Sequence, residues 1–270
     1  MSFLEGKVAI ITGSSRGIGK AIAIKLAQEG LKIILNGRNQ ERLDSAKLEI
    51  EKINTNILCY CCDVTEELES KKLIDFALKQ FGRLDILISN VGVSNRGTVA
   101  NTNPEVFRRV FSSNFFGSIY PTLAALPHIK NNKGSIVFIS SVAGIRGLPS
   151  LGAYCSSKMA LRAIAESIRI EEYASGIHVG LVYVGKAEIE HNKESIAADG
   201  SLVILKDRPS KNILAAAYIA KKVFLNIKRR KFITTLSTIG KINLFMQSFF
   251  PMLVEKIIIK TSKKFNQGLK

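Results

Sequence analysis

The sequence has no tryptophan, three histidines and four cysteines among its 270 residues. The histidines, His128, His178 and His191, share no metal-ligand spacing, so no metal site is expected. Three of the cysteines fall in one apolar run, 56–63, which favours reduced, buried thiols in a cytoplasmic protein over a disulfide-stabilised secreted one. The stretch 1–13 lacks the basic region, long apolar run and cleavage site of a signal peptide, and is interpreted as leading into the first strand.

Acidic residues are scarce toward the C-terminal end. Residues 201–270 contain 15 Lys and Arg but only two acids, Asp207 and Glu255, a balance of +13. The first 200 residues hold 24 basic and 20 acidic side chains, a balance of +4. The net charge of +17 is therefore concentrated in one part of the chain, and a local basic surface needs a local explanation.

Short apolar runs alternate with segments of helical spacing through most of the chain. This alternation predicts a mostly parallel sheet with helices on both faces, which is the three-layer, doubly wound α/β fold of the Rossmann type. Strands are expected at 7–12, 32–36, 56–63, 84–90, 134–140, 177–184 and 230–235. Helices are expected at about 20–30, 40–52, 66–81, 104–126, 154–174 and 209–227.

The chain is expected to consist of one domain and an extension. Residues 1–235 form the Rossmann-type catalytic domain, with a flap at about 185–210. The first part of this flap, 185–201, is polar and lacks strand alternation. Residues 236–270 form a C-terminal extension that is both basic and apolar.

Apolar residues recur at every third or fourth position of this extension, which predicts one apolar helical face broken at Pro251. The uncharged run 242–254 has only 13 residues, short of the roughly 20 needed to span a bilayer. A basic, amphipathic end favours peripheral contact with an anionic membrane on its cytoplasmic face. Packing against another subunit is the main alternative; nucleic-acid binding is disfavoured because aromatic residues are not interleaved with the basic ones. The apolar positions are Ile239, Ile242, Phe245, Phe249, Leu253 and Ile257.

A glycine-rich turn, TGSSRGIG, lies between the first expected strand and the first expected helix. Gly13, Gly17 and Gly19 let the backbone approach a pyrophosphate closely, and the helix start offers free N–H groups and a positive dipole end. The G-x-x-x-G-x-G spacing differs from the usual G-x-G-x-x-G. Its position on the first strand of a doubly wound sheet is what indicates a dinucleotide site.

The end of the second expected strand bears on which dinucleotide binds. A dehydrogenase that prefers NAD usually has an acid here, which binds the ribose hydroxyls. This chain has Gly37 and Arg38 instead, and Arg16 lies in the first turn. Two guanidiniums can hold a 2′-phosphate by charge-assisted hydrogen bonds, so NADP(H) is favoured over NAD(H). The alternative is a pair of solvated surface arginines.

Tyr154 and Lys158 lie four residues apart and therefore share one face of an expected helix. Taken alone, such a pair is more often an ordinary surface pair. If the two side chains meet, the ammonium favours the phenolate and lowers the phenol pKa from its usual value of about 10.

Taken together, these motifs resemble the short-chain dehydrogenase/reductase family over residues 7–185. The family's T-G-x-x-x-G-x-G is found at 12–19, and its Y-x-x-x-K is Tyr154 and Lys158. Its catalytic serine matches Ser141, which lies 13 residues before Tyr154, and its helix asparagine matches Asn114. The run VGKAEIE, which begins at Val184, stands where the family usually has Pro-Gly and a following Thr.

The resemblance implies a role for each of these residues. Tyr154 would transfer the proton, and Lys158 would lower its pKa and grip the nicotinamide ribose. Ser141 would donate a hydrogen bond to the substrate oxygen, and Asn114 would hold a water that links the lysine to solvent. The residues implied to bind the cofactor are Gly13, Ser15, Arg16, Gly17, Ile18, Gly19, Arg38, Asp63, Val64, Asn90, Gly92, Tyr154, Lys158, Val184 and Gly185.

The sequence therefore predicts an NADPH-dependent carbonyl reductase that interconverts a ketone and a secondary alcohol. The basic, apolar extension favours an apolar or lipid-like substrate, and the resemblance implies a homodimer or homotetramer. Two other functions stay open: a catalytically weak NADP-binding regulator, and a scaffold bound to a membrane or to nucleic acid.

Overall fold

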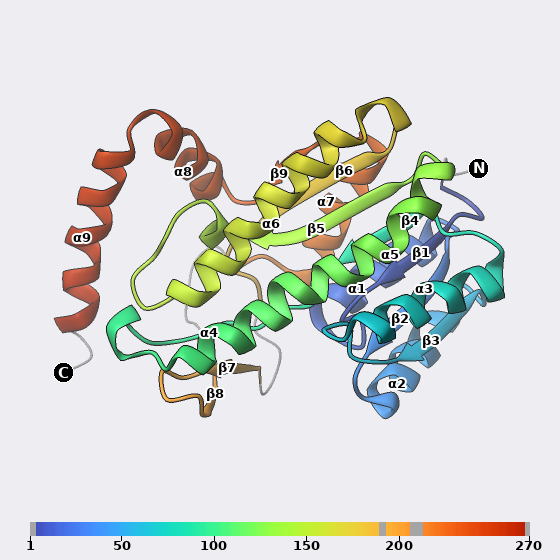
Figure 1. The fold of residues 1–270 in the computed structure, drawn as a ribbon, viewed down its shortest axis with the longest axis horizontal. Helices are drawn as coiled ribbons and strands as arrows, with labels where there is room; N and C mark the ends of the chain where they lie inside the picture. The colour runs from blue at the N-terminus through green and yellow to red at the C-terminus, as the bar shows by residue number, and fades with distance from the viewer. Residues whose placement is uncertain (1–3, 189–192, 206–212, 268–270) are drawn as a thin grey trace.

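Seven parallel strands form the central sheet of the computed structural model, which describes residues 4–188, 193–205 and 213–267 (Figure 1). The strand order is β3-β2-β1-β4-β5-β6-β9, so the expected doubly wound α/β fold is confirmed. The strands are β1 (Val8–Ile11), β2 (Lys32–Gly37), β3 (Ile57–Cys61), β4 (Ile86–Ser89), β5 (Ser135–Ser141), β6 (His178–Val184) and β9 (Ile233–Thr235).

Helices cover both faces of this sheet, and each face has its own apolar core. The helices on one face are α1 (Gly17–Gln28), α2 (Gln40–Glu51) and α7 (Ala216–Lys228). They contribute buried residues such as Ile22, Leu43 and Val223 to the core on that face. Leu73 and Leu161 belong to the core on the other face. The helices there are α3 (Glu67–Phe81), α5 (Gly117–Asn131) and α6 (Gly152–Glu171). Strand residues alternate between the two cores, as expected for strands buried on both sides.

The strand order reverses between β1 and β4, which are neighbours in the sheet although β2 and β3 lie between them in the chain. The segments that follow the strands all leave from the same edge of a parallel sheet. In doubly wound sheets, ligands bind at this edge, beside the point of reversal. The glycine-rich turn after β1 and residues 89–92 at the end of β4 meet there, where the Asn90 side chain donates to the Thr12 and Gly13 carbonyls.

Two expected helices differ from those observed. The segment 104–126 was expected as one helix, but it consists of α4 (Pro104–Phe111), a π-helical turn at Ser112–Phe116, and α5, which continues to Asn131. The helix expected at 209–227 begins only at Ala216, and residues 209–212 lie outside the described part of the chain.

The segment expected as a flap, about 185–210, contains strands although its first part lacks strand alternation. Within its described residues, β7 (Glu194–Ile196) and β8 (Leu202–Ile204) form an antiparallel hairpin. The hairpin is bonded to the 94–103 segment, because Ile196 N–H donates to the Ser94 carbonyl at 2.9 Å and Asn103 N–H donates to the Ala198 carbonyl at 2.8 Å. These long-range bonds explain strands that local alternation does not indicate.

The four cysteines are free thiols. Cys62 and Cys155 are buried and Cys59 is half-buried, but Cys61 is exposed, so the expectation of buried thiols is wrong for Cys61.

The extension forms two helices, α8 (Thr238–Phe249) and α9 (Pro251–Gln267), and the predicted break at Pro251 is confirmed. Figure 1 shows α9, in red, standing apart from the sheet. Arg146 attaches it to the loop after β5, since its guanidinium donates to the Pro251 carbonyl at 3.2 Å and lies 3.6 Å from a Glu255 carboxylate oxygen. Among the described residues, none of the helices has the length and apolar character needed to cross a bilayer.

Candidate active site

The glycine-rich turn brings β1 directly onto the start of α1. Gly13 and Gly17 have φ of 62° and 54°, a left-handed conformation that glycine adopts without a Cβ penalty. A Cβ on Gly19 would lie 2.3 Å from the Gly13 carbonyl oxygen, so no larger residue fits there. The Asn90 amide closes the turn by donating to the Thr12 and Gly13 carbonyls, each at 3.0 Å. The turn therefore leaves the helix N-terminus facing a cavity.

This cavity has a volume of about 710 Å³ and lies along the carboxyl edge of the sheet. Every residue expected to bind the cofactor lines it, except Gly17. Pockets of this size hold small-molecule ligands and cofactors, and the missing Cβ atoms of the glycines leave room for a close approach to the backbone. The residues present therefore fit a nicotinamide dinucleotide.

Arg38 and Asp63 meet at the end of the cavity formed by β2 and β3. The Arg38 Nη1 donates to the Asp63 Oδ2 at 3.3 Å, and the Thr65 N–H donates to the Asp63 Oδ1 at 3.0 Å. Burial raises the pKa of the Asp63 carboxyl, but the Thr65 hydrogen bonds and the Arg38 charge outweigh it and lower the pKa overall. Asp63 is thus a fixed anion, and the guanidinium beside it is largely exposed to solvent.

Tyr154 and Lys158 lie on the first turns of α6, and both line the cavity. Tyr154 is half-buried, and its backbone N–H donates to the Asn95 side chain at 2.9 Å. Lys158 is only 4% exposed, and its Nζ donates to the Ile139 carbonyl at 3.0 Å. Burial, with a smaller contribution from the charge of Lys193, lowers the pKa of Lys158 to about 8. The pair is therefore not an ordinary surface pair.

Ser141 ends β5 on the same cavity wall. Its hydroxyl oxygen accepts a hydrogen bond from the Ala143 N–H at 3.2 Å, so the hydroxyl hydrogen remains available to a ligand. Ser140 also lines the cavity, but its hydroxyl hydrogen is already used, because it donates to the Lys158 carbonyl at 3.2 Å. The structure thus separates the roles of two adjacent serines that the sequence places side by side.

Asn114 lies in the π-helical turn between α4 and α5 and is fully buried behind the cavity. Its amide oxygen accepts from the Val93 N–H at 2.7 Å, and its amide nitrogen donates to the Val93 carbonyl and the Ser157 hydroxyl. A Cβ on Gly92 would lie 3.0 Å from the Asn114 Oδ1 and 3.1 Å from the Lys158 Nζ. Gly92 therefore marks the point where the asparagine and the lysine approach each other.

Comparisons with known proteins identify relatives of this chain. A family described as short chain dehydrogenase matches residues 7–200. A dehydrogenase/reductase SDR family member 7B from Danio rerio is 30% identical over 97% of this chain and 87% of its own length. A 3-ketodihydrosphingosine reductase from Bos taurus is 37% identical over 67% of this chain and 56% of its own length. An alcohol dehydrogenase structure from Thermococcus sibiricus, complexed with 5-hydroxy-NADP, superposes with a TM-score of 0.74 at 25% identity, covering 86% of this chain and 96% of that one.

The chain belongs to the short-chain dehydrogenase family. The expectation of an NAD(P)-dependent oxidoreductase of this family is confirmed.

In this short-chain dehydrogenase, Val184 and Gly185 stand at the end of β6 where the family usually has Pro-Gly. Val184 ends β6 opposite Ser141 on β5, and both Val184 and Gly185 line the cavity. A Cβ on Gly185 would lie 3.1 Å from the Ser237 hydroxyl at the start of α8. The turn therefore packs against the beginning of the C-terminal extension. Ile189, which stands near the position of the family's threonine, lies outside the described residues.

Two residues of the site were not singled out from the sequence. The Asn95 side chain accepts a hydrogen bond from the Tyr154 N–H and so fixes the first turn of α6. Lys193, just before β7, lines the cavity of this short-chain dehydrogenase, and its charge contributes to the lowered pKa of Lys158. Neither residue belongs to a recognisable sequence motif, because each reaches the site only through contacts between segments that are distant in the sequence. Among the described residues, no His, Cys, Asp or Glu cluster has the makeup of a metal site.

Proposed function

We propose that this chain is an NADPH-dependent reductase that interconverts a ketone and a secondary alcohol by hydride transfer. The observation that carries this proposal is that Ser141, Tyr154 and the buried Lys158 line the same cavity as the glycine-rich turn. Catalysis requires the proton donor and the carbonyl-binding group to converge on one ligand, and a shared cavity satisfies that condition.

A bound dihydronicotinamide would supply the hydride. Ser141 donates its hydroxyl hydrogen to the carbonyl oxygen and holds it beside Tyr154. Tyr154 then gives its phenolic proton to the oxygen as negative charge develops there. Lys158, which carries its charge below a pKa of about 8, favours the phenolate that remains.

Asn114 is proposed to support the return of the proton. Its amide oxygen uses one lone pair for the Val93 N–H, which leaves the second lone pair for a water. The approach of Asn114 and Lys158 around Gly92 supports a water between them. In this scheme the water re-protonates the lysine from solvent after each turnover.

NADPH is proposed over NADH because Arg16 and Arg38 both line the cavity. The second strand ends in Gly37 and Arg38 rather than in an acid. A 2′-phosphate beside these two guanidiniums forms charge-assisted hydrogen bonds that an unmodified ribose hydroxyl does not offer.

An apolar, lipid-like substrate and peripheral membrane contact complete the proposal. The six apolar positions predicted on one face of the extension are between 48% and 68% exposed. Arg146 links α9 to the loop after Ser141, and Leu148 and Leu151 of the same loop line the cavity. The bovine relative is named as a 3-ketodihydrosphingosine reductase, which fits a long-chain ketone. A homodimer or homotetramer is proposed from the habit of the family.

The first experiment is Tyr154→Phe, which removes the phenolic hydroxyl and keeps the ring. We expect NADPH binding to be retained and turnover to fall by about 10²–10⁴, the usual contribution of a positioned general acid. The measurements are NADPH fluorescence titration and NADPH oxidation with ketones of graded chain length, in the presence of lipid. Tyr173→Phe, which alters an exposed tyrosine after α6, is the matched control and should keep full activity.

A fully active Tyr154→Phe protein would disprove the mechanism. Absence of turnover with every ketone in the starting protein, despite NADPH binding, would favour the alternative of a catalytically weak NADP-binding regulator.

A further inference from the structure

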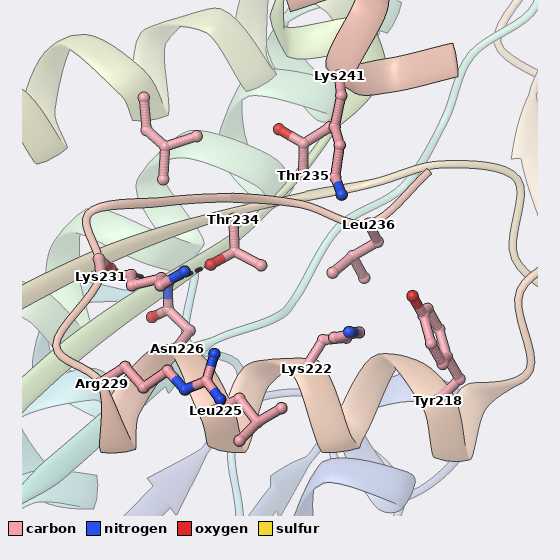
Figure 2. A pocket seen from close by; sticks show the side chains of 11 residues that line it. Tyr218, Lys222, Leu225, Asn226, Arg229, Lys231, Thr234, Thr235, Leu236 and Lys241 are labelled. Carbon is pink, nitrogen blue, oxygen red and sulfur yellow. Dashed lines mark hydrogen bonds between the residues drawn. The ribbon is translucent and has the colours of Figure 1, made fainter. Parts of the chain in front are cut away.

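A second cavity of about 220 Å³ lies at the opposite edge of the sheet from β3, between α7, β9 and the first turn of α8 (Figure 2). It shares no described lining residue with the cofactor cavity. Its volume is below the range of about 300–1,000 Å³ typical of cofactor and drug-sized sites, so it suits a small ligand or a headgroup.

Four basic side chains line this cavity: Lys222, Arg229, Lys231 and Lys241. The described lining contains no acidic residue, and the sequence from 208 to 254 has no Asp or Glu at all. Figure 2 shows the Lys241 ammonium pointing down toward the cavity from α8, while Lys222 rises from α7 below it. Four cations that lie together without a carboxylate repel one another. A bound anion would be attracted to all four and would offset this repulsion.

The walls that carry these cations are fixed by buried contacts. A Cβ on Gly240 would lie 2.8 Å from the Thr235 side chain, so the first turn of α8 packs directly on β9 and holds Lys241 over the cavity. On the other side, Asn226 is 1% exposed, and its amide nitrogen donates to the Lys231 carbonyl at 2.8 Å and to the Thr234 hydroxyl oxygen at 2.9 Å. Since Thr234 is the acceptor in that bond, its own hydroxyl hydrogen is available to a ligand in the cavity.

We infer that this cavity is a second ligand site that binds a phosphate group. At neutral pH a phosphate monoester carries a charge of about −1.5 to −2 and three acceptor oxygens, which match several cations and one hydroxyl donor. Inorganic phosphate, a soluble phosphate ester and the headgroup of phosphatidic acid share this chemistry. The exposed Ile239 and Ile242 next to Lys241 would lie beside the acyl chains if the phosphate belongs to a lipid.

The test compares two double variants that remove the same charge from different surfaces. Lys222→Gln/Lys241→Gln alters the second cavity, and Lys52→Gln/Lys71→Gln alters exposed lysines at α2 and α3. Phosphate affinity is measured by calorimetric titration, and thermal unfolding checks that each variant is folded. We expect the cavity variant to bind phosphate about tenfold more weakly or worse, because it loses two charge-assisted hydrogen bonds, and the surface variant to match the starting protein.

Two further probes identify the source of the phosphate. Weaker binding of glycerol 3-phosphate to the cavity variant supports the site and assigns it to a soluble ester. Weaker binding confined to phosphatidylcholine vesicles that contain phosphatidic acid supports the site and assigns it to a lipid headgroup. Both double variants keep the cofactor cavity, so phosphate bound there cancels in the comparison. Equal affinities of the two double variants for all three probes would overturn the inference.

Discussion

Lys158 and Cys62 line the same cavity, and burial drives both toward the neutral form. For Cys62, burial raises the pKa of the thiol to about 12, so the thiol stays protonated and unreactive at neutral pH. For Lys158, burial lowers the pKa to about 8, which still leaves most of the ammonium charged at neutral pH. Burial thus keeps the Cys62 thiol protonated and unreactive, and it brings the pKa of Lys158 close to neutral pH, where the side chain can exchange a proton.

The proposed preference for NADPH also depends on single residues, and Arg38→Asp tests it. We expect the affinity for NADPH to fall about tenfold or more, because a second carboxylate beside Asp63 repels the 2′-phosphate that Arg38 would have bound. NADH affinity should hold or rise, since an acid at this position can accept the ribose hydroxyls. Fluorescence titration with both cofactors provides the comparison, and Lys71→Asp, on an exposed face of α3, controls for the change in net charge. Equal NADH and NADPH affinities in the starting protein would refute the preference.

At the scale of secondary structure, elements with a buried face could be predicted and elements made by distant contacts could not. The strands β1, β4 and β6 are short apolar runs bounded by polar residues, so their pattern alone indicates them. In β8 every residue is exposed, and β7 is stabilised by the distant Ser94 segment. A strand held by such partners has no local signature.

The same distinction applies to the candidate site. Ser141, Tyr154 and Lys158 could be named from their motif, because their spacing is fixed by the ends of a strand and a helix. The π-helical turn that carries Asn114 was not predicted, since no residue type marks such a turn. In the structure the buried Asn114 side chain accepts a hydrogen bond from the Val93 N–H and donates one to the Val93 carbonyl. Lys193 reaches the site only through the placement of the hairpin.

The helices α8 and α9 present an apolar face whose role can be tested separately from the basic cavity. Phe245→Ser/Phe249→Ser should reduce co-sedimentation with phosphatidylserine-containing vesicles about tenfold or more, because each aromatic ring contributes on the order of 1–2 kcal/mol when it leaves water. Leu48→Ser/Leu68→Ser, which replaces equally exposed leucines on α2 and α3, should sediment like the starting protein. If both double variants sediment alike, the face packs against another subunit instead, and sedimentation velocity should then show a smaller assembly only for the phenylalanine variant.

For the molecule as a whole, one buried histidine couples the edge of the sheet to pH. His178 begins β6 and is almost fully buried; its Nδ1 lies 3.2 Å from the Ser135 hydroxyl and its Nε2 lies 2.9 Å from the Lys231 carbonyl. Burial, aided by the charges of Arg230 and Arg169 and opposed by the bond to the Lys231 carbonyl, lowers the pKa of His178 from 6.5 to about 4. The folded protein therefore holds this imidazole neutral at a pH where the unfolded chain already protonates it.

This depressed pKa predicts a loss of stability in acid. The stabilising contribution is complete above pH 6.5 and disappears as the pH falls to about 4, a change of about 3 kcal/mol in the free energy of unfolding. Urea unfolding across that range measures the slope in the starting protein and in His178→Asn. The variant should be less stable at neutral pH, because it loses part of the bond network with Lys231, yet its stability should fall less steeply in acid. His128→Asn, on the half-buried side of α5, should keep the steep slope. Parallel curves for the starting protein and His178→Asn would mean that His178 is not the source of the acid sensitivity.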